Sequence, residues 1–217
     1  MGMDTMSVFI SVGTPANDRQ EAFIRAVEDR LRSEGLVPHT VGRNTFSSDA
    51  PLKAVTELMD KCSGAVVIAL ERTFFPNGLQ KRGGPEESAI ANVKLPTPWN
   101  QVEAAMAYAR GHPLLIIVEN GLKSEGLLER GYDWYVQWVT PDPSALHSLE
   151  FNGVLASWKE KVQARTMHAG LARPDPGEMT VGEMLKDLRL SQLWAVLAAV
   201  VALVIGAFTL GAKLFAA

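Results

Sequence analysis

The chain has 217 residues, a formal charge of −3 and one cysteine, Cys62. That length predicts one α/β domain of about 150 residues with an appendage. The charge balance excludes the basic signature of a nucleic-acid-binding protein, so we expect no nucleic-acid partner. A lone cysteine excludes an internal disulfide and a thiolate metal cluster. The four histidines show no metal-ligand spacing, and we predict no metal and no cofactor.

The first elements read as a strand followed by a helix. Residues 7–13 are apolar on both faces, which is typical of a strand covered on both sides of a parallel sheet. Asn17 or Asp18 follows as the predicted cap of a helix over residues 19–33. A second short strand is predicted at residues 36–41, where a proline favours an edge position in the sheet.

The polar loop at residues 42–49 follows that second strand. Loops at the carboxyl ends of strands form the ligand crevice in open α/β sheets, and Gly13 ends the first strand at the same edge. Arg43 and Ser47 are therefore candidate contacts for a phosphate. The alternative is a solvated loop in which Asp49 caps the next helix.

A helix over residues 51–63 and a buried strand over residues 65–70 come next. Glu71 and Arg72 follow that strand on the crevice side, and either side chain is a candidate ligand contact. The alternative is that both form surface ion pairs. The segment 75–98 is long, proline-containing and glycine-containing, and we predict an irregular loop that serves as a lid or an assembly contact.

The helix predicted to begin at Pro98 carries Trp99 and Glu103. Small residues at Ala104 and Ala107 indicate close packing of this helix on a sheet. A first-turn position for Glu103 would put its carboxylate near the positive end of the helix dipole, at the mouth of the sheet. At that position the Glu103 carboxylate would accept a hydrogen bond from a sugar hydroxyl or assist bond cleavage. The alternative is a glutamate that only stabilises its own helix.

The remaining elements of the domain are a strand at residues 114–118, an aromatic-rich strand at residues 132–139 and a long helix at residues 145–167. The aromatic side chains of the second strand could stack on a base. Packing or a subunit contact is the alternative.

The C-terminal part differs in character from the rest of the chain. Residues 168–180 read as a linker, and residues 180–190 as a short amphipathic helix at a membrane surface. Residues 193–212 contain no charged residue and have the length of about 20 that crosses a bilayer as a helix. A buried core helix is the alternative. We therefore divide the chain into a domain at 1–167, a linker with an amphipathic helix at 168–190 and a transmembrane helix at 191–217.

The flanks of the apolar segment predict its orientation. Lys186 and Arg189 precede it, and basic residues favour the cytoplasmic side, so the N-terminal domain is expected in the cytoplasm. Small residues recur every four positions within it at Ala198, Ala202 and Gly206. This spacing permits close helix approach, so we expect self-association in the bilayer.

Three stretches carry a family resemblance: residues 8–11, residues 64–68 and residues 98–105. In this order they resemble a toll/interleukin-receptor (TIR) domain and the related nucleoside 2-deoxyribosyltransferases, over roughly residues 7 to 165. The resemblance implies a flavodoxin-like or TIR-like α/β fold with about five parallel strands and flanking helices. It also implies that Glu103 contacts a ribose and takes part in N-glycosidic bond cleavage.

The domain organisation is similar to that of membrane effectors in bacterial anti-phage systems, which respond to cyclic nucleotides. It implies a single-pass protein of the bacterial inner membrane that binds a signalling nucleotide, forms a homo-oligomer and disrupts the lipid bilayer. The alternative is a membrane-tethered N-glycosidase acting on NAD or a nucleoside through Glu103. The two readings differ in whether the chain is an enzyme. The candidate ligand contacts are Gly13, Arg43, Ser47, Glu71, Trp99 and Glu103.

Overall fold

The structure is a computed structural model that describes residues 6–131 and 133–171. Within these ranges, no helix combines the length and the apolarity that crossing a bilayer requires. The predicted linker, amphipathic helix and transmembrane helix fall almost entirely beyond residue 171, outside the described residues. They stay predictions.

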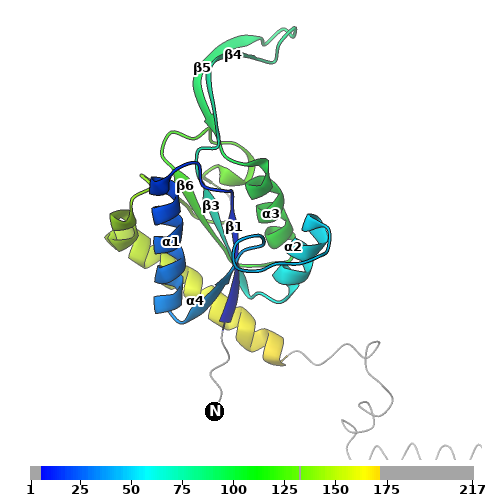
Figure 1. Cartoon of the computed structure of the whole chain (residues 1–217), viewed down its shortest axis with the longest axis vertical. Coiled ribbons are helices and arrows are strands. Elements are labelled where there is room, and N and C mark those ends of the chain that lie inside the picture. Colours follow the sequence, from blue (N-terminus) through cyan, green and yellow to red (C-terminus); the bar gives the residue numbers. More distant parts are fainter. Residues whose placement is uncertain (1–5, 132, 172–217) are drawn as a thin grey trace, which may run out of the picture. The chain divides into compact units, whose positions relative to one another are not determined.

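A five-stranded parallel sheet forms the centre of the domain (Figure 1). Its strands lie in the order β2-β1-β3-β6-β7, and every neighbouring pair runs parallel. This is the doubly wound order of flavodoxin-like sheets. The predicted α/β class and the number of parallel strands are confirmed. The strands are β1 (Met6–Val12), β2 (Leu36–His39), β3 (Gly64–Ala69), β6 (Leu114–Glu119) and β7 (Val136–Val139).

Helices cover both faces of this sheet, with α1 (Asp18–Ser33) and α4 (Leu149–Leu171) on one face (Figure 1). The other face carries α2 (Pro51–Asp60) and α3 (Pro98–Ala109). The described residues also form two short 3-10 helices, η1 (Gly126–Leu128) and η2 (Pro143–His147).

The strand sequences explain why both faces are covered. Successive side chains of a strand point to opposite faces, and in β1 Val8 and Ile10 pack with α1 and α4, while Phe9 packs with α2. All six residues of β3 are buried, which is typical of a central parallel strand. Pro38 lies in β2, at the edge of the sheet as predicted, where a missing N–H costs no ladder bond on the open side.

The helix that bears Glu103 packs tightly on the sheet. Ala104 and Ala107 are fully buried, as the small residues predicted. The helix begins at Pro98, after the N-cap Thr97, so Glu103 is its sixth residue and lies in the second turn. The helix start at Pro98 is as predicted, but one turn holds only about 3.6 residues, so the first-turn position predicted for Glu103 is wrong.

A β-hairpin replaces the irregular loop predicted at residues 75–98. Strands β4 (Thr73–Gln80) and β5 (Ser88–Leu95) pair with each other antiparallel and stand away from the sheet (Figure 1). Pro76 is tolerated because both strands of a lone hairpin are edge strands. Residues 73–95 are called the arm below.

Two further elements have bounds that differ from the prediction. Of the strand expected at residues 132–139, the described residues form only the part that is β7. The helix expected at residues 145–167 is divided into η2 and α4, because the Ser148 hydroxyl accepts a hydrogen bond from the Phe151 backbone N–H and caps a new helix.

Candidate functional site

A polar cleft of about 330 Å³ lies beside Glu103, at the carboxyl ends of β1 and β3. Helix α1, which follows β1, and helix α3, which follows β3 and the arm, cover opposite faces of the sheet. Such a switch in direction leaves a crevice between the two strand ends, and this is where open α/β sheets bind ligands. The cleft is lined by Val12, Gly13, Thr14, Val41, Pro51, Val55, Arg72, Thr97, Trp99 and Glu103.

Glu103 is the one carboxylate among the described residues that line this cleft. Burial of its side chain raises its pKa from 4.5 to about 7, and a hydrogen bond with Ser11 opposes that shift. The larger effect is the loss of water around the charged form. Near neutral pH the carboxyl group is therefore present in both its protonated and its ionised form, as a general acid or base requires.

Asn100 holds Ser11 beside Glu103. The Asn100 amide nitrogen Nδ2 donates to Ser11 Oγ at 3.0 Å, to the Ser11 carbonyl at 3.3 Å and to the Ile68 carbonyl at 3.4 Å. Both Asn100 and Ser11 are 1% exposed. Asn100 and Glu103 are three residues apart and share one face of α3. This network ties the site to the ends of both central strands.

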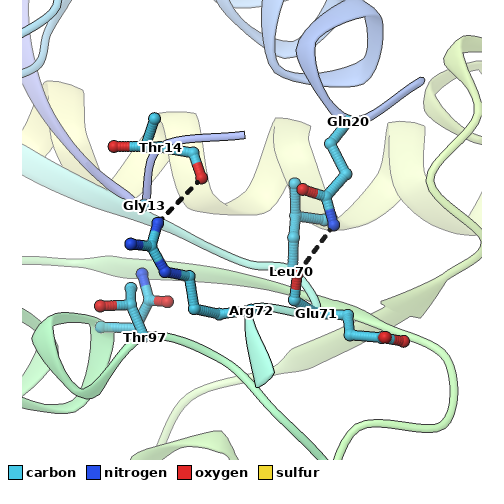
Figure 2. A pocket seen from close by; sticks show the side chains of 8 residues that line it. Gly13, Thr14, Gln20, Leu70, Glu71, Arg72 and Thr97 are labelled. Carbon is cyan, nitrogen blue, oxygen red and sulfur yellow. Dashed lines mark hydrogen bonds between the residues drawn. The ribbon is translucent and has the colours of Figure 1, made fainter. Parts of the chain in front are cut away.

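A second cavity of about 10 Å³, the size of one water molecule, adjoins the cleft (Figure 2). Gly13, Thr14, Arg72 and Thr97 line both cavities, and Asn100 also lines the smaller one. The Asn100 carbonyl Oδ1 is buried and has no hydrogen-bond partner within the described residues. Buried polar atoms of this kind are commonly satisfied by an internal water.

Arg72 and Trp99 provide the exposed rim of the cleft. The Arg72 guanidinium donates to the Thr14 carbonyl at 3.3 Å (Figure 2). Arg72 is an exposed residue, so its guanidinium remains available to an anionic group. Trp99 is 46% exposed and presents an aromatic surface beside Glu103. A cation and an aromatic ring are complementary to a phosphate and a base, respectively.

Glu71 lies next to the smaller cavity, but its side chain is occupied elsewhere. Its carboxylate accepts from Lys94 Nζ at 2.6 Å, and in Figure 2 it points away from the cavity. Its carbonyl accepts from Gln20 at 2.9 Å, and its N–H donates to Glu119 at 2.7 Å. The structure therefore brings the backbone of Glu71, but not its carboxylate, to the site. The carboxylate forms an ion pair with Lys94, which agrees with the predicted alternative for Glu71.

Arg43 and Ser47 are not among the residues that line either cavity. The Arg43 guanidinium binds α1 instead, with bonds of 2.9 and 3.0 Å to Glu21 and 2.7 Å to Glu28. The Ser47 hydroxyl exchanges hydrogen bonds with Asp49 in an exposed loop. Of the six predicted ligand contacts, the cleft thus brings together Gly13, Trp99 and Glu103.

Sequence reasoning missed Ser11, Thr97 and Asn100. Asn100 could have been found from its spacing, since a polar residue three positions before Glu103 on a sheet-facing helix must share its buried face. Ser11 is a polar residue that directly follows the apolar run Val8, Phe9 and Ile10 of its strand, which is a similar signal. Thr97 has no comparable signal, because its exposure depends on how the arm returns to the sheet.

The two tryptophans near β7 pack within the domain. Trp134 contacts Tyr108 edge to face with ring centres 5.1 Å apart and donates to the Leu127 carbonyl at 3.0 Å. Trp138 lies under the Arg130 guanidinium at 5.9 Å. Neither tryptophan lines the cleft beside Glu103. In the described ranges 6–131 and 133–171, no three His, Cys, Asp or Glu residues are grouped so as to hold a metal ion.

Comparison with known proteins found no matching family profile and no matching curated protein. Among solved structures, the chain is similar to a CMP N-glycosidase of Clostridium botulinum, BcmB, at 16% sequence identity and a TM-score of 0.35. That alignment covers 62% of this chain and 87% of the other.

Proposed function

We propose that the cleft binds a nucleoside or nucleotide and that Glu103 takes part in cleaving its N-glycosidic bond. The observation that supports this most directly is a carboxyl group with a pKa of about 7 in a cleft at the switch point of the sheet. A volume of about 330 Å³ lies at the lower end of small-molecule sites, so a single nucleotide is the expected size of ligand.

The proposed chemistry uses both protonation states of Glu103. The bond between the anomeric carbon and the base nitrogen breaks, and its electron pair leaves with the base. The protonated carboxyl supplies the proton that the departing base takes up. A water molecule then adds its oxygen to the anomeric carbon, and the proton it releases returns to the Glu103 carboxylate.

The other lining residues fit roles in binding. Trp99 offers a surface on which a base can stack, and Arg72 offers a guanidinium for a phosphate. Gly13 leaves backbone at the end of β1 accessible, and a Cβ added there would lie 3.1 Å from the Thr97 methyl group.

The direct test is base release by the full chain. It is incubated with a panel of nucleosides, mononucleotides, cyclic nucleotides and NAD, and free base is measured by chromatography. Glu103→Gln is expected to lower the rate by at least about 100-fold. Glu125→Gln, at an exposed position away from the cleft, is the control. Equal rates in wild type and Glu103→Gln would contradict the proposal.

The second candidate is a membrane effector of bacterial anti-phage defence, in which the cleft binds a cyclic or other signalling nucleotide without cleaving it. The charge-free segment 193–212 favours it, since the segment suits a single-pass anchor in the inner membrane with the domain in the cytoplasm. The cleft lining also lacks a second carboxylate among the described residues, which glycosidases of the two-carboxylate type require.

In this second candidate, ligand binding drives homo-oligomer formation, and the clustered helices then disrupt the bilayer. A ligand achieves this only if it binds the assembled form more tightly, by about 5.5 kcal/mol for a shift from 1:99 to 99:1. The test is dye leakage from liposomes carrying the full chain. Leakage that appears only with a nucleotide supports this candidate, and leakage without any nucleotide contradicts it.

A further inference from the structure

The arm has one apolar face. Residues directly opposite in an antiparallel pair have their side chains on the same side, and the pairs Phe75–Val93, Asn77–Ala91 and Leu79–Ala89 share one face. Five of these six side chains are apolar, and none is charged. The other face carries the pairs Phe74–Lys94, Gly78–Ile90 and Gln80–Ser88, in which one side chain is charged, two are polar and two, Phe74 and Ile90, are apolar. The face with Phe75, Leu79, Ala89, Ala91 and Val93 is called the apolar face of the arm below.

This face is not covered by the rest of the domain. All eight residues of β4 are exposed, with Phe75 at 45% and Leu79 at 52%. Figure 1 shows the arm projecting beyond the helices and the sheet. A two-stranded hairpin alone is only marginally stable in water, and a hydrophobic face needs a second layer to pack against.

The charge distribution of the arm points to a second copy of this chain as that layer. An uncharged face can meet its own copy in a two-fold interface without bringing like charges together. The turn at the tip carries Lys81 and Arg82 together with Glu86 and Glu87, and Lys81 pairs with Glu86 within the same arm, so the tip has no net charge that would repel a second copy. A membrane surface or a nucleic acid would instead favour an excess of basic residues.

We propose that two copies of the chain associate by packing the apolar faces of their arms against each other, about 10 Å apart as in stacked sheets. Each contact surface is small. Two strands of eight residues cover roughly 27 Å by 10 Å, well below the ~800 Å² per partner of a standard stable interface. The association is therefore weak and depends on protein concentration. Chemical cross-linking is a better probe of it than the size of the particle in solution.

This interface would also reach the candidate site. Arg72 immediately precedes β4 and Thr97 closely follows β5, and both residues line the cleft. Association through the arm would therefore restrain two cleft residues at once. The proposal itself does not depend on what the cleft binds.

The test uses the full chain in mild detergent with two cysteine variants and a short bis-maleimide. Ala91→Cys places a thiol in the middle of the apolar face. Ile90→Cys places one at the next residue, on the opposite face. The natural Cys62 is buried and serves as the unreactive background. We expect a covalent dimer from Ala91→Cys and at least tenfold less from Ile90→Cys.

Leu79→Glu in the Ala91→Cys chain is the second part of the test. It adds a charge to the apolar face at an exposed position, so the fold is retained, as circular dichroism would verify. We expect it to lower the covalent dimer at least tenfold, while Gln80→Glu on the opposite face leaves it unchanged. Equal cross-linking of Ala91→Cys and Ile90→Cys, or cross-linking that survives Leu79→Glu, overturns the proposal. The absence of a covalent dimer from Ala91→Cys also overturns the proposal, and it would indicate that the arm contacts lipid or another protein.

Discussion

The amide nitrogen of Asn100 donates a hydrogen bond to the Ser11 hydroxyl at 3.0 Å, and this bond orients the hydroxyl as a donor toward Glu103. Because the serine oxygen accepts from Asn100, its own proton is free to be donated to the Glu103 carboxylate. That donation stabilises the ionised form and limits how far burial raises the pKa of Glu103.

Ser11→Ala should therefore raise the pKa of Glu103 further. A hydrogen bond contributes about 1 kcal/mol net, so the midpoint of any pH profile that follows Glu103 should move up by about 0.5–1 pH unit. The measurement is the pH dependence of base release, or of nucleotide affinity if no base is released. Ser33→Ala, at a surface serine, should leave the midpoint in place. An unchanged midpoint in Ser11→Ala would exclude the assigned role of Ser11.

Glu103→Gln should stabilise the domain in a manner that depends on pH. The folded chain holds the Glu103 proton up to about pH 7 and the unfolded chain only to about 4.5, so stability is lost as pH rises between these values. The neutral amide avoids that loss. We expect a gain of up to about 3 kcal/mol at pH 8 and almost none at pH 4. Urea unfolding at both pH values measures it, and a gain of the same size at pH 4 would contradict the buried-carboxyl explanation.

Asn100 and Trp99 are neighbours in α3 with opposite expected roles. Asn100→Ala removes three hydrogen bonds between α3 and the ends of β1 and β3, so we expect a loss of about 2 kcal/mol or more in unfolding free energy. Trp99→Ala changes an exposed side chain and should cost under about 0.5 kcal/mol while weakening nucleotide binding. Urea unfolding and calorimetric titration separate the two, and a strongly destabilised Trp99→Ala would refute the division.

Arg43→Gln should affect stability and not ligand affinity. Bonds from Arg43, and to a lesser extent from Arg25, lower the pKa of Glu21 from 4.5 to about 2. A lowered carboxyl pKa contributes stability that is present above pH 4.5 and lost as pH falls toward 2. We expect Arg43→Gln to cost about 1–3 kcal/mol at pH 7 and less at pH 2.5.

Arg72→Gln is the companion variant for Arg43→Gln, since Arg72 lines the cleft. It should weaken binding of a phosphate-bearing nucleotide by about tenfold or more and leave stability nearly unchanged. Calorimetric titration with a nucleotide and its unphosphorylated nucleoside provides the comparison. Weaker binding in Arg43→Gln than in Arg72→Gln would restore Arg43 as the phosphate contact.

The sheet and its helices could be predicted because their residues carry strong local patterns. The apolar run of β3 and the helical spacing of Phe23, Ile24, Val27 and Leu31 in α1 allow few alternatives. The arm could not be predicted with the same rules. Its apolar residues alternate on a hairpin that contacts the described domain at its base, near Lys94, and its proline, asparagine and glycine residues are typical of loops as well.

The part of the candidate site that depends on the order and direction of the strands could be predicted from the sequence. Gly13, Trp99 and Glu103 follow from the rule that ligands bind at the carboxyl ends of the strands. Arg43 follows the same rule but points elsewhere, because two carboxylates on α1 lie within reach of its long side chain. Local sequence cannot reveal such a competition, since Glu21 and Arg43 are 22 residues apart.

A backbone hydrogen bond joins the two ends of the arm: the Arg72 N–H donates to the Leu95 carbonyl at 2.9 Å. The backbone is thus already closed beneath the hairpin, much as a tight turn would close it. The hairpin is in this sense an insertion, free to vary in length or to be exchanged for another sequence while the fold beneath it persists. Relatives with a shorter or absent hairpin would keep the same cleft and differ in their self-association.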